Sequence, residues 1–182
     1  MNIRSKWAAS VIIAAGTALS VNNAYAQEAP APAVPYKQVI SANPFGLLLE
    51  FFNAEYERVV GESSTVGIGG SYYGAAGDDV DEFGEPISGE DYTNVDAFYR
   101  FYPQGRPLDG WAFGAKVGVT KVVDQGTYFG YGFDVNRSWL LGKKNNFYVG
   151  LGFGLKKLVG ANEEVDLEYI PTFRIVNVGW AF

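Results

Sequence analysis

Apolar and other residues alternate along most of the chain after residue 37. In the segment 147–156, phenylalanine, valine and leucine occupy the odd positions, whereas glycine, tyrosine and lysine occupy the even positions. Successive side chains of a β-strand point to opposite faces, so this pattern predicts a strand that is apolar on one face only. The same period of two recurs in 92–102, 110–123 and 127–141, which predicts further strands there.

These alternating segments, with the turn residues between them, predict eight strands. The predicted strands cover residues 37–48, 52–60, 65–75, 92–102, 110–123, 127–141, 147–159 and 169–182. A tight turn near 49–51 divides 37–60 into two strands and gives the even strand count that is the rule for bacterial membrane barrels. Glycine, proline and polar residues mark three short connections, 61–64, 103–109 and 142–146. The other connections are a turn at 124–126 and two longer acidic segments, 76–91 and 160–168.

The composition of the two faces favours a barrel with lipid outside over a soluble sandwich or a lipocalin-like barrel, in which the apolar face would point inward. Glycine dominates the polar face, whereas a solvated sheet would be rich in lysine, threonine and glutamate. The apolar face carries aromatic residues near strand ends, as membrane barrels do at both interfaces: Trp111, Tyr131, Trp139 and Trp180. We therefore predict an all-β fold, an eight-stranded antiparallel up-and-down transmembrane β-barrel over residues 37–182. Because periplasmic turns are short, both termini are expected in the periplasm and the longer loops outside the cell.

The first 26 residues have the order of features found in a secretory signal peptide. Arg4 and Lys6 precede a short apolar stretch at 11–19, and an Ala-Tyr-Ala cleavage motif ends at Ala26. We therefore expect export with cleavage after Ala26, and an outer-membrane location for the mature chain. Residues 27–36 are rich in proline and alanine and are expected to form a periplasmic tether, not a separate domain.

Composition then argues against several classes of function. The chain has 14 Lys and Arg against 20 Asp and Glu, a net charge of −6, which argues against nucleic-acid binding. It contains no cysteine and no histidine, and so lacks thiolate chemistry and the most common general base and metal ligand. The Gly-x-Ser-x-Gly motif is absent as well, so the serine–histidine machinery of outer-membrane lipid A deacylases and phospholipases has no counterpart. We expect no enzymatic activity and no cofactor.

Seven charged residues fall on the face that alternation turns inward. They are Glu55, Glu57, Asp96, Arg100, Lys116, Asp134 and Lys156. Side chains fill the interior of an eight-stranded barrel, and charges there must pair because an isolated charge away from water is costly. We interpret the set as a structural salt-bridge network; a proton or ion path and paired carboxylates for acid–base chemistry are the alternatives. Strict alternation places Arg137 and Arg174 on the lipid face, so each should either reach a strand end or be turned inward by a β-bulge.

Glycine is also frequent on the inward face. The inward glycines are Gly67, Gly69, Gly114, Gly118, Gly150, Gly152 and Gly154. Glycine within a strand marks the close approach of a neighbour, so we interpret these positions as room for large side chains. A small water-filled cavity or a narrow pore is the alternative.

The acidic segment 76–91 is a weak candidate for a metal site. Asp79, Asp81 and Glu90 stand at positions 1, 3 and 12 of a calcium-loop pattern, with Gly84 at position 6. Position 5 is Phe83, where the pattern requires Asp or Asn, and no helices are expected beside the segment. A solvated surface loop is therefore the preferred interpretation.

Several short motifs are spread over the mature chain. They are Asn43-Pro44-Phe45-Gly46, the run NAEYER at 53–58, Tyr99-Arg100-Phe101-Tyr102, Pro171-Thr172 and the ending Gly179-Trp180-Ala181-Phe182. Together they resemble a family of small outer-membrane β-barrels, similar in architecture to the OmpA transmembrane domain and OmpX. The final strand, with Val178, Trp180 and Phe182 on one face, also resembles the signal that the barrel-assembly machinery reads. The resemblance implies an architecture and brings no catalytic residues.

The sequence thus favours a non-enzymatic outer-membrane barrel with a structural role, or a surface-interaction role through acidic extracellular loops. One alternative is a narrow pore or small-ligand carrier with a glycine-lined interior. Another is an adhesin or a divalent-cation-binding surface protein. The expected partners are outer-membrane lipid and lipopolysaccharide and the barrel-assembly machinery; the sequence names no extracellular partner.

Overall fold

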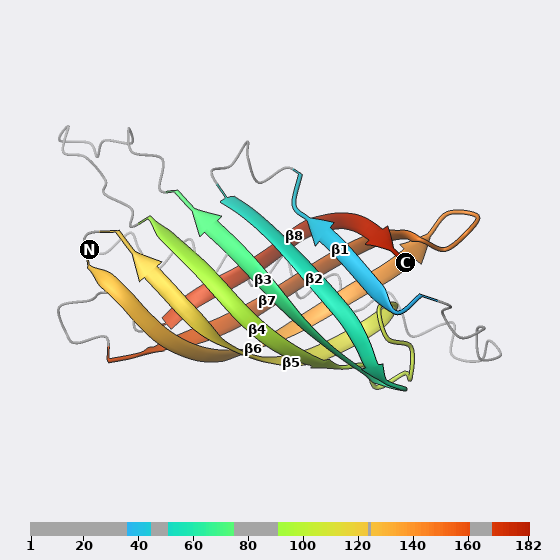
Figure 1. The fold of residues 1–182 in the computed structure, drawn as a ribbon, viewed down its shortest axis with the longest axis horizontal. Coiled ribbons are helices and arrows are strands. Elements are labelled where there is room, and N and C mark those ends of the chain that lie inside the picture. Colours follow the sequence, from blue (N-terminus) through green and yellow to red (C-terminus); the bar gives the residue numbers. More distant parts are fainter. Residues whose placement is uncertain (1–35, 45–50, 75–90, 124, 161–168) are drawn as a thin grey trace, which may run out of the picture. The chain divides into compact units, whose positions relative to one another are not determined.

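Eight antiparallel strands close into a β-barrel in the computed structural model, which describes residues 36–44, 51–74, 91–123, 125–160 and 169–182 (Figure 1). The strands are β1 (Gln38–Ala42), β2 (Phe51–Gly61), β3 (Ser64–Tyr73), β4 (Tyr92–Phe101), β5 (Gly110–Val122), β6 (Gly126–Leu141), β7 (Phe147–Val159) and β8 (Tyr169–Ala181). Each strand pairs with the next along the chain and β8 pairs with β1, which confirms the predicted up-and-down topology. Among the described residues, no helix is long and apolar enough to cross a membrane.

The two ends of the barrel carry different connections between strands. One end, the terminal rim, has the start of β1, the end of β8 and the turns that follow β2, β4 and β6; β2 and β8 end on the right of Figure 1. The opposite end, the loop rim, is where the other four connections attach. Most of the acidic segment 76–91, with Asp79, Asp81 and Glu90, lies outside the described residues, as do the first 35 residues of the chain.

Seven of the predicted strands agree with the structure to within two residues at each end. The first prediction is too long, because β1 ends at Ala42 and both Asn43 and Pro44 lie outside the strand. Proline has no N–H to donate to a ladder, which makes it a natural end to the pairing of β1 with β2. The turn predicted near 49–51 also extends too far, since Phe51 is the first residue of β2 and pairs with Tyr73.

A β-bulge in β8 shifts its register against β7. Gly150 faces Asn177 whereas Gly152 faces Arg174, so Ile175 and Val176 together oppose one residue of β7. Val176 has a φ of 47°, in the left-handed region. The bulge turns both Arg174 and Asn177 inward (5% and 0% exposed) and leaves Ile175 45% exposed. Strict alternation, which predicts Arg174 outward and Ile175 inward, is therefore wrong, because one added residue reverses the faces. Of the two expectations for Arg174, the bulge is the one observed.

Arg137 follows the other expectation and stays on the outward face near the terminal rim. It pairs in register with Trp111, the second residue of β5. Its guanidinium carbon lies 6.0 Å from the ring centre of Trp111 and 5.1 Å from that of Trp139. Two aromatic faces thus provide cation–π contacts for a charge on an otherwise apolar surface.

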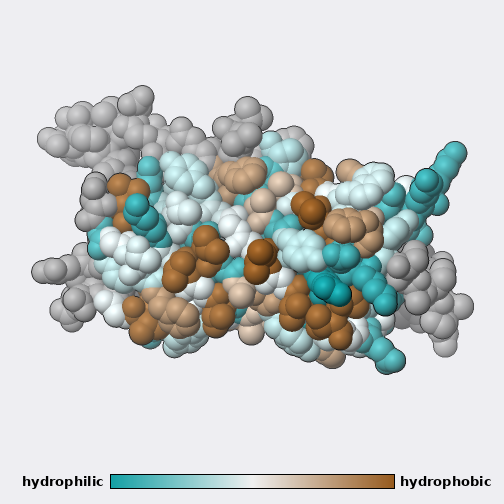
Figure 2. All heavy atoms as spheres, viewed as in Figure 1, coloured by the Kyte–Doolittle hydropathy of each residue, from teal (hydrophilic) through white to brown (hydrophobic). Residues whose placement is uncertain are grey.

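The outward face of the strands is apolar and exposed. Large exposed side chains include Ile68, Val95, Phe113, Phe133, Phe153 and Trp180. Figure 2 shows such side chains in several patches along one side of the barrel. A soluble protein would bury side chains of this kind, so the faces have the orientation expected for a wall in contact with lipid.

The interior of the barrel is layered. An apolar cluster fills the terminal rim: Val39, Leu108, Tyr148 and Ala181. Near the loop rim the rings of Phe51, Tyr73 and Tyr92 are in contact, and Val122, Leu158 and Ile170 are buried. Polar and charged side chains occupy the middle, where the candidate site lies.

Candidate functional site

The structure places all seven of the predicted inward charges inside the barrel, and the bulge in β8 adds Arg174 to them. The described strands therefore place four carboxylates and four cations in the interior, whereas alternation alone predicts four and three. Strict alternation leaves Arg174 out of the inward set, and a bulge is one of two expectations for it, because the period of two does not locate a bulge. Two signals did point to it: the unequal charge count, and an arginine assigned to the lipid face.

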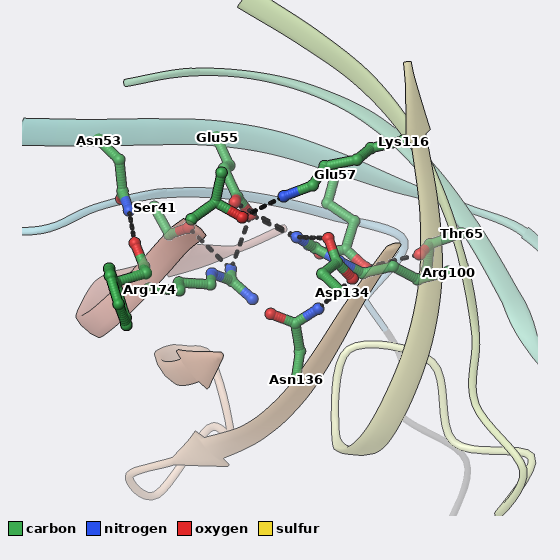
Figure 3. A network of polar contacts seen from close by, with 12 residues as sticks. Ser41, Asn53, Glu55, Glu57, Thr65, Arg100, Lys116, Asp134, Asn136 and Arg174 are labelled. Carbon is green, nitrogen blue, oxygen red and sulfur yellow. Dashed lines mark hydrogen bonds and ion pairs between the residues drawn. The ribbon is translucent and has the colours of Figure 1, made fainter. Parts of the chain in front are cut away.

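The centre of the site is the guanidinium of Arg100, which crosses from β4 to carboxylates on β2 and β6 (Figure 3). Its Nη1 donates to Glu57 Oε2 at 2.7 Å and to Glu55 Oε2 at 3.0 Å, and its Nη2 donates to Glu55 Oε1 at 3.2 Å. Asp134 Oδ2 lies 3.4 Å from Nη2. Three carboxylates thus share one buried cation, and Phe98 lies below it with 3.9 Å between the guanidinium carbon and the ring centre. We call Arg100, Glu55, Glu57, Asp134 and Arg174 the Arg100 cluster.

Glu57 is the most fully enclosed carboxylate of the Arg100 cluster, with no exposed surface. Besides Arg100, its Oε1 accepts hydrogen bonds from Thr65 Oγ1 at 2.6 Å and from the Tyr102 hydroxyl at 2.7 Å. Tyr102 lies just beyond the end of β4, and burial together with the charge of Glu57 raises the pKa of its phenol above the ordinary range. The phenol therefore stays protonated and donates. Every polar atom of the Glu57 side chain is bonded, which offsets the cost of burying its charge.

Arg174 is the second cation that contacts the carboxylate of Glu55. Its Nη2 lies 3.0 Å from Glu55 Oε2, 2.8 Å from the Tyr148 hydroxyl and 3.4 Å from Ser41 Oγ. Its Nε and Nη1 have no hydrogen-bond partner among the described residues. Arg174 as a residue also lines the small cavity described below.

A second group of polar residues lies closer to the loop rim. Lys156 Nζ is 2.5 Å from Asp96 Oδ1 and 3.4 Å from Asn94 Oδ1. Thr120 also donates to Asn94 Oδ1, and Asn94 Nδ2 donates to Ser71 Oγ at 3.3 Å. We call Lys156, Asp96, Asn94 and Thr120 the Lys156 cluster. The remaining inward cation, Lys116, donates to Thr172 Oγ1.

The inward glycines make room for these side chains. A methyl group added at Gly114 would collide with the carboxylate of Asp134, and one at Gly152 would collide with the amide of Asn136. One at Gly67 would overlap the ring of Phe98. Neighbouring side chains therefore fill the space where a side chain at these glycines would lie. This agrees with the interpretation of the glycines as room for large side chains.

The space left among these residues is small. A cavity of about 60 Å³ is lined by Glu55, Arg100, Lys116, Asp134 and Arg174, among others. Because a water needs about 10–15 Å³ measured in this way, there is room for a few waters, whereas ligand sites take about 300–1,000 Å³. No group of three or more metal-ligating side chains occurs in the described part of the chain.

The predicted assembly residues lie on the outward face at the seam of the barrel. Val178, Trp180 and Phe182 follow one another on that face, and Trp180 faces Ile40 of β1. The backbone of Phe182 donates to Gln38 O at 2.9 Å, and its carbonyl accepts from the N–H groups of Gln38 and Lys37 at 3.0 and 3.2 Å. These residues therefore take part in closing β8 against β1.

Comparison with known proteins bears on the fold. The chain is similar to the Yersinia pestis outer membrane protein Ail, whose backbone structure in a phospholipid bilayer nanodisc gives a TM-score of 0.50 at 16% identity, over 81% of this chain and 99% of Ail. The N-terminal β-barrel domain of Pseudomonas aeruginosa OprF gives a TM-score of 0.40 at 13% identity, over 80% of this chain and 94% of that domain. No protein-family model and no curated protein sequence matches the chain. The likeness to Ail confirms the small outer-membrane-type barrel fold that the sequence motifs indicate.

Proposed function

We propose that this protein is a non-enzymatic outer-membrane β-barrel, with a structural role or a surface-interaction role through its acidic loops. The observation that carries the proposal is the division of residues between the two faces of the wall. The outward face is apolar and exposed, whereas the carboxylates of the strands, Glu55, Glu57, Asp96 and Asp134, lie inside. Apolar surface of this extent is stable only when covered, and a closed barrel leaves no unpaired strand edge in lipid.

The packed interior supports a structural role over the alternative of a narrow pore or small-ligand carrier. Apolar layers occupy both rims, ion-paired side chains fill the middle, and the cavity between them has room only for waters. Paired and buried charges of this kind hold the strands together across the lumen. The carboxylates of Glu55 and Glu57 are held by cations and hydroxyl donors, so they make poor acid–base catalysts.

The acidic loops are the proposed contact surface. The segments 76–91 and 160–168 attach at the loop rim, opposite the start of β1 and the end of β8. With the termini in the periplasm, these loops face the medium and are placed to meet lipopolysaccharide, cations or another cell. The adhesin and divalent-cation alternatives depend on the same loops, with Asp79, Asp81 and Glu90 as the cation candidates.

Cell fractionation tests the location. The full chain expressed in a Gram-negative host should separate with the outer membrane, lose residues 1–26, and show a folded band that shifts in mobility on heating. Protein recovered from the soluble periplasm, or without a heat-dependent band, would contradict the proposal. Protease added to intact cells should cut within 76–91 or 160–168 and spare Arg106 in the turn after β4; cleavage at Arg106 alone would invert the topology.

Planar-bilayer recording separates the structural role from the pore. Refolded protein should produce no discrete conductance steps, because side chains fill the lumen. Stable steps that scale with added protein would favour the pore instead.

A further inference from the structure

The charged residues on the outward face of the strands are all basic. They are Arg58, Lys121, Arg137 and Lys157, and every acidic residue of the strands points inward. The chain as a whole carries a net charge of −6, so this bias runs against its composition. A cation on a wall surrounded by lipid is stabilised by the anionic phosphates at the bilayer surface. The outward cations therefore indicate contact with lipid phosphate.

A groove lies beside one of these cations. It has a volume of about 640 Å³ and runs over the outward face of β2 to β5. Its floor is formed by the small side chains of Ala97 and Ala115, and larger side chains, those of Tyr56, Ile68 and Tyr99, rise beside it. The volume is within the range of about 300–1,000 Å³ that ligand sites occupy. Apart from Arg58 and Lys116, the residues that line it are aliphatic, aromatic or glycine, as an acyl chain requires.

Arg58 lines the same groove near the terminal rim. It is exposed, stands three residues before the end of β2, and forms no ion pair with any described residue. Arg58 pairs with Val66 of β3, which in turn pairs with Tyr99 of β4. Further from the rim, Tyr56 pairs with Ile68, which pairs with Ala97. The hydroxyl of Tyr56 donates to Gln38 Oε1 at 2.5 Å, which holds that ring in place as a wall of the groove. Arg58, Ala97 and Ala115 thus line one continuous surface. A lipid headgroup at Arg58 and its acyl chain over the two alanines would both fit on it.

We propose that this groove binds one anionic glycerophospholipid, with an acyl chain over Ala97 and Ala115 and the phosphate at Arg58. The inference rests on the proposed membrane location, and the proposed topology makes this a lipid of the periplasmic leaflet. An anionic headgroup is favoured over a zwitterionic one because the Arg58 guanidinium has no carboxylate partner among the described residues, and a headgroup amine would add a second cation beside it.

Arg137 provides the matched control. It is also an outward arginine near the terminal rim, but it lies on β6, away from the groove. Its guanidinium already lies against the rings of Trp111 and Trp139. Removing its charge alters the wall by the same amount and leaves the groove intact.

Native mass spectrometry of the refolded full chain tests the proposal. The protein is prepared in non-ionic detergent with an equimolar mixture of phosphatidylglycerol and phosphatidylcholine that carry the same two acyl chains. Wild-type protein should retain one phosphatidylglycerol in preference to phosphatidylcholine. Arg58→Gln should lower that preference about fivefold, the contribution of one interfacial arginine near anionic lipid. Arg137→Gln should leave the preference unchanged, and Ala115→Leu, which fills the floor of the groove, should reduce the retention of both lipids.

The possible outcomes separate the lipid site from the proposed function. The heat-dependent band on a gel first shows that every variant is folded; leucine facing lipid does not disturb a barrel wall. If the folded wild-type barrel retains no lipid, or shows no preference for phosphatidylglycerol, the proposed lipid site is wrong. That result would not contradict the proposed membrane location. Equal loss in Arg58→Gln and Arg137→Gln would show that general wall charge is responsible and would also overturn it. A chain that does not fold in detergent or bilayers contradicts the proposed function itself.

Discussion

The Arg100 cluster and the Lys156 cluster lie in the same lumen and hold their charges differently. In the Arg100 cluster one guanidinium contacts carboxylates from two other strands, and a second arginine holds one of them from β8. In the Lys156 cluster a single ammonium contacts a single carboxylate, that of Asp96. The first arrangement joins β2, β4, β6 and β8 through ion pairs, whereas the ion pair of the second joins β4 and β7 and a hydrogen bond from Thr120 adds β5.

The difference shows where the barrel depends on its charges. A guanidinium has five donors in a fixed plane and can serve several carboxylates at once, which a single ammonium does less well. Removing the shared cation leaves three neighbouring carboxylates without it, whereas removing Lys156 leaves one carboxylate without its cation. Stability should therefore be unequally distributed between the two clusters, and the following substitutions measure the inequality.

The largest loss is expected for Arg100→Ala. Breaking a buried ion pair on one side typically costs about 3–5 kcal/mol, and water in the neighbouring cavity should place the loss near the lower value. Unfolding in urea, followed by the heat-dependent band, measures it. Adding Glu55→Gln and Glu57→Gln to Arg100→Ala should recover part of the loss, because the uncompensated charges are then removed. A triple variant no more stable than Arg100→Ala would contradict the network.

A smaller loss is expected for Lys156→Met. The ammonium makes one close charge-assisted contact, so the free energy of unfolding should fall by about 1.5–3 kcal/mol. The double variant Lys156→Met with Asp96→Asn should recover part of this. If Lys156→Met proves as damaging as Arg100→Ala, the proposed inequality between the clusters is wrong.

The two arginines that strict alternation puts on the lipid face give the next comparison. Arg174→Gln removes the second cation that contacts Glu55 and should destabilise the barrel by about 1–3 kcal/mol. Arg137→Gln removes the contacts with Trp111 and Trp139 and an electrostatic attraction to Asp109, and should cost about 0.5–1 kcal/mol. Urea titration of both variants under the same conditions measures the difference. Equal losses would mean that the inward turn of Arg174 does not strengthen the Arg100 cluster.

The smallest change in stability is expected at Phe182, which lies outside both clusters. The seam contacts of this residue are made by its backbone, so Phe182→Ala keeps them and should refold in detergent nearly as well as wild type. In cells the same variant should give a sharply reduced heat-dependent band, because the terminal aromatic is the proposed assembly signal. Wild-type levels of folded protein in cells would refute that signal, and a matching failure to refold in detergent would make the residue structural instead.

The positions of the strands could be read from the sequence because alternation is a local property of the backbone. A period of two, interrupted by glycine, proline and polar residues, located seven strands to within two residues and turned Glu55, Arg100 and Asp134 to the inside. The glycines opposite these side chains follow the same logic, since a filled lumen needs small residues where large ones cross it.

Only the tertiary structure decided which charges meet and how many there are. Arg100 contacts Glu57 and Asp134, which lie 43 and 34 residues away in the sequence. These contacts depend on how the sheet closes into a barrel. Arg174 joined them because β8 accommodates one extra residue against β7 at Val176. Alternation along one strand cannot foresee a bulge, because its position is set by the register of the partner strand and by the closure of β8 on β1. The sequence by itself therefore determined the two faces of the wall, and the paired sheet determined the charge balance within it.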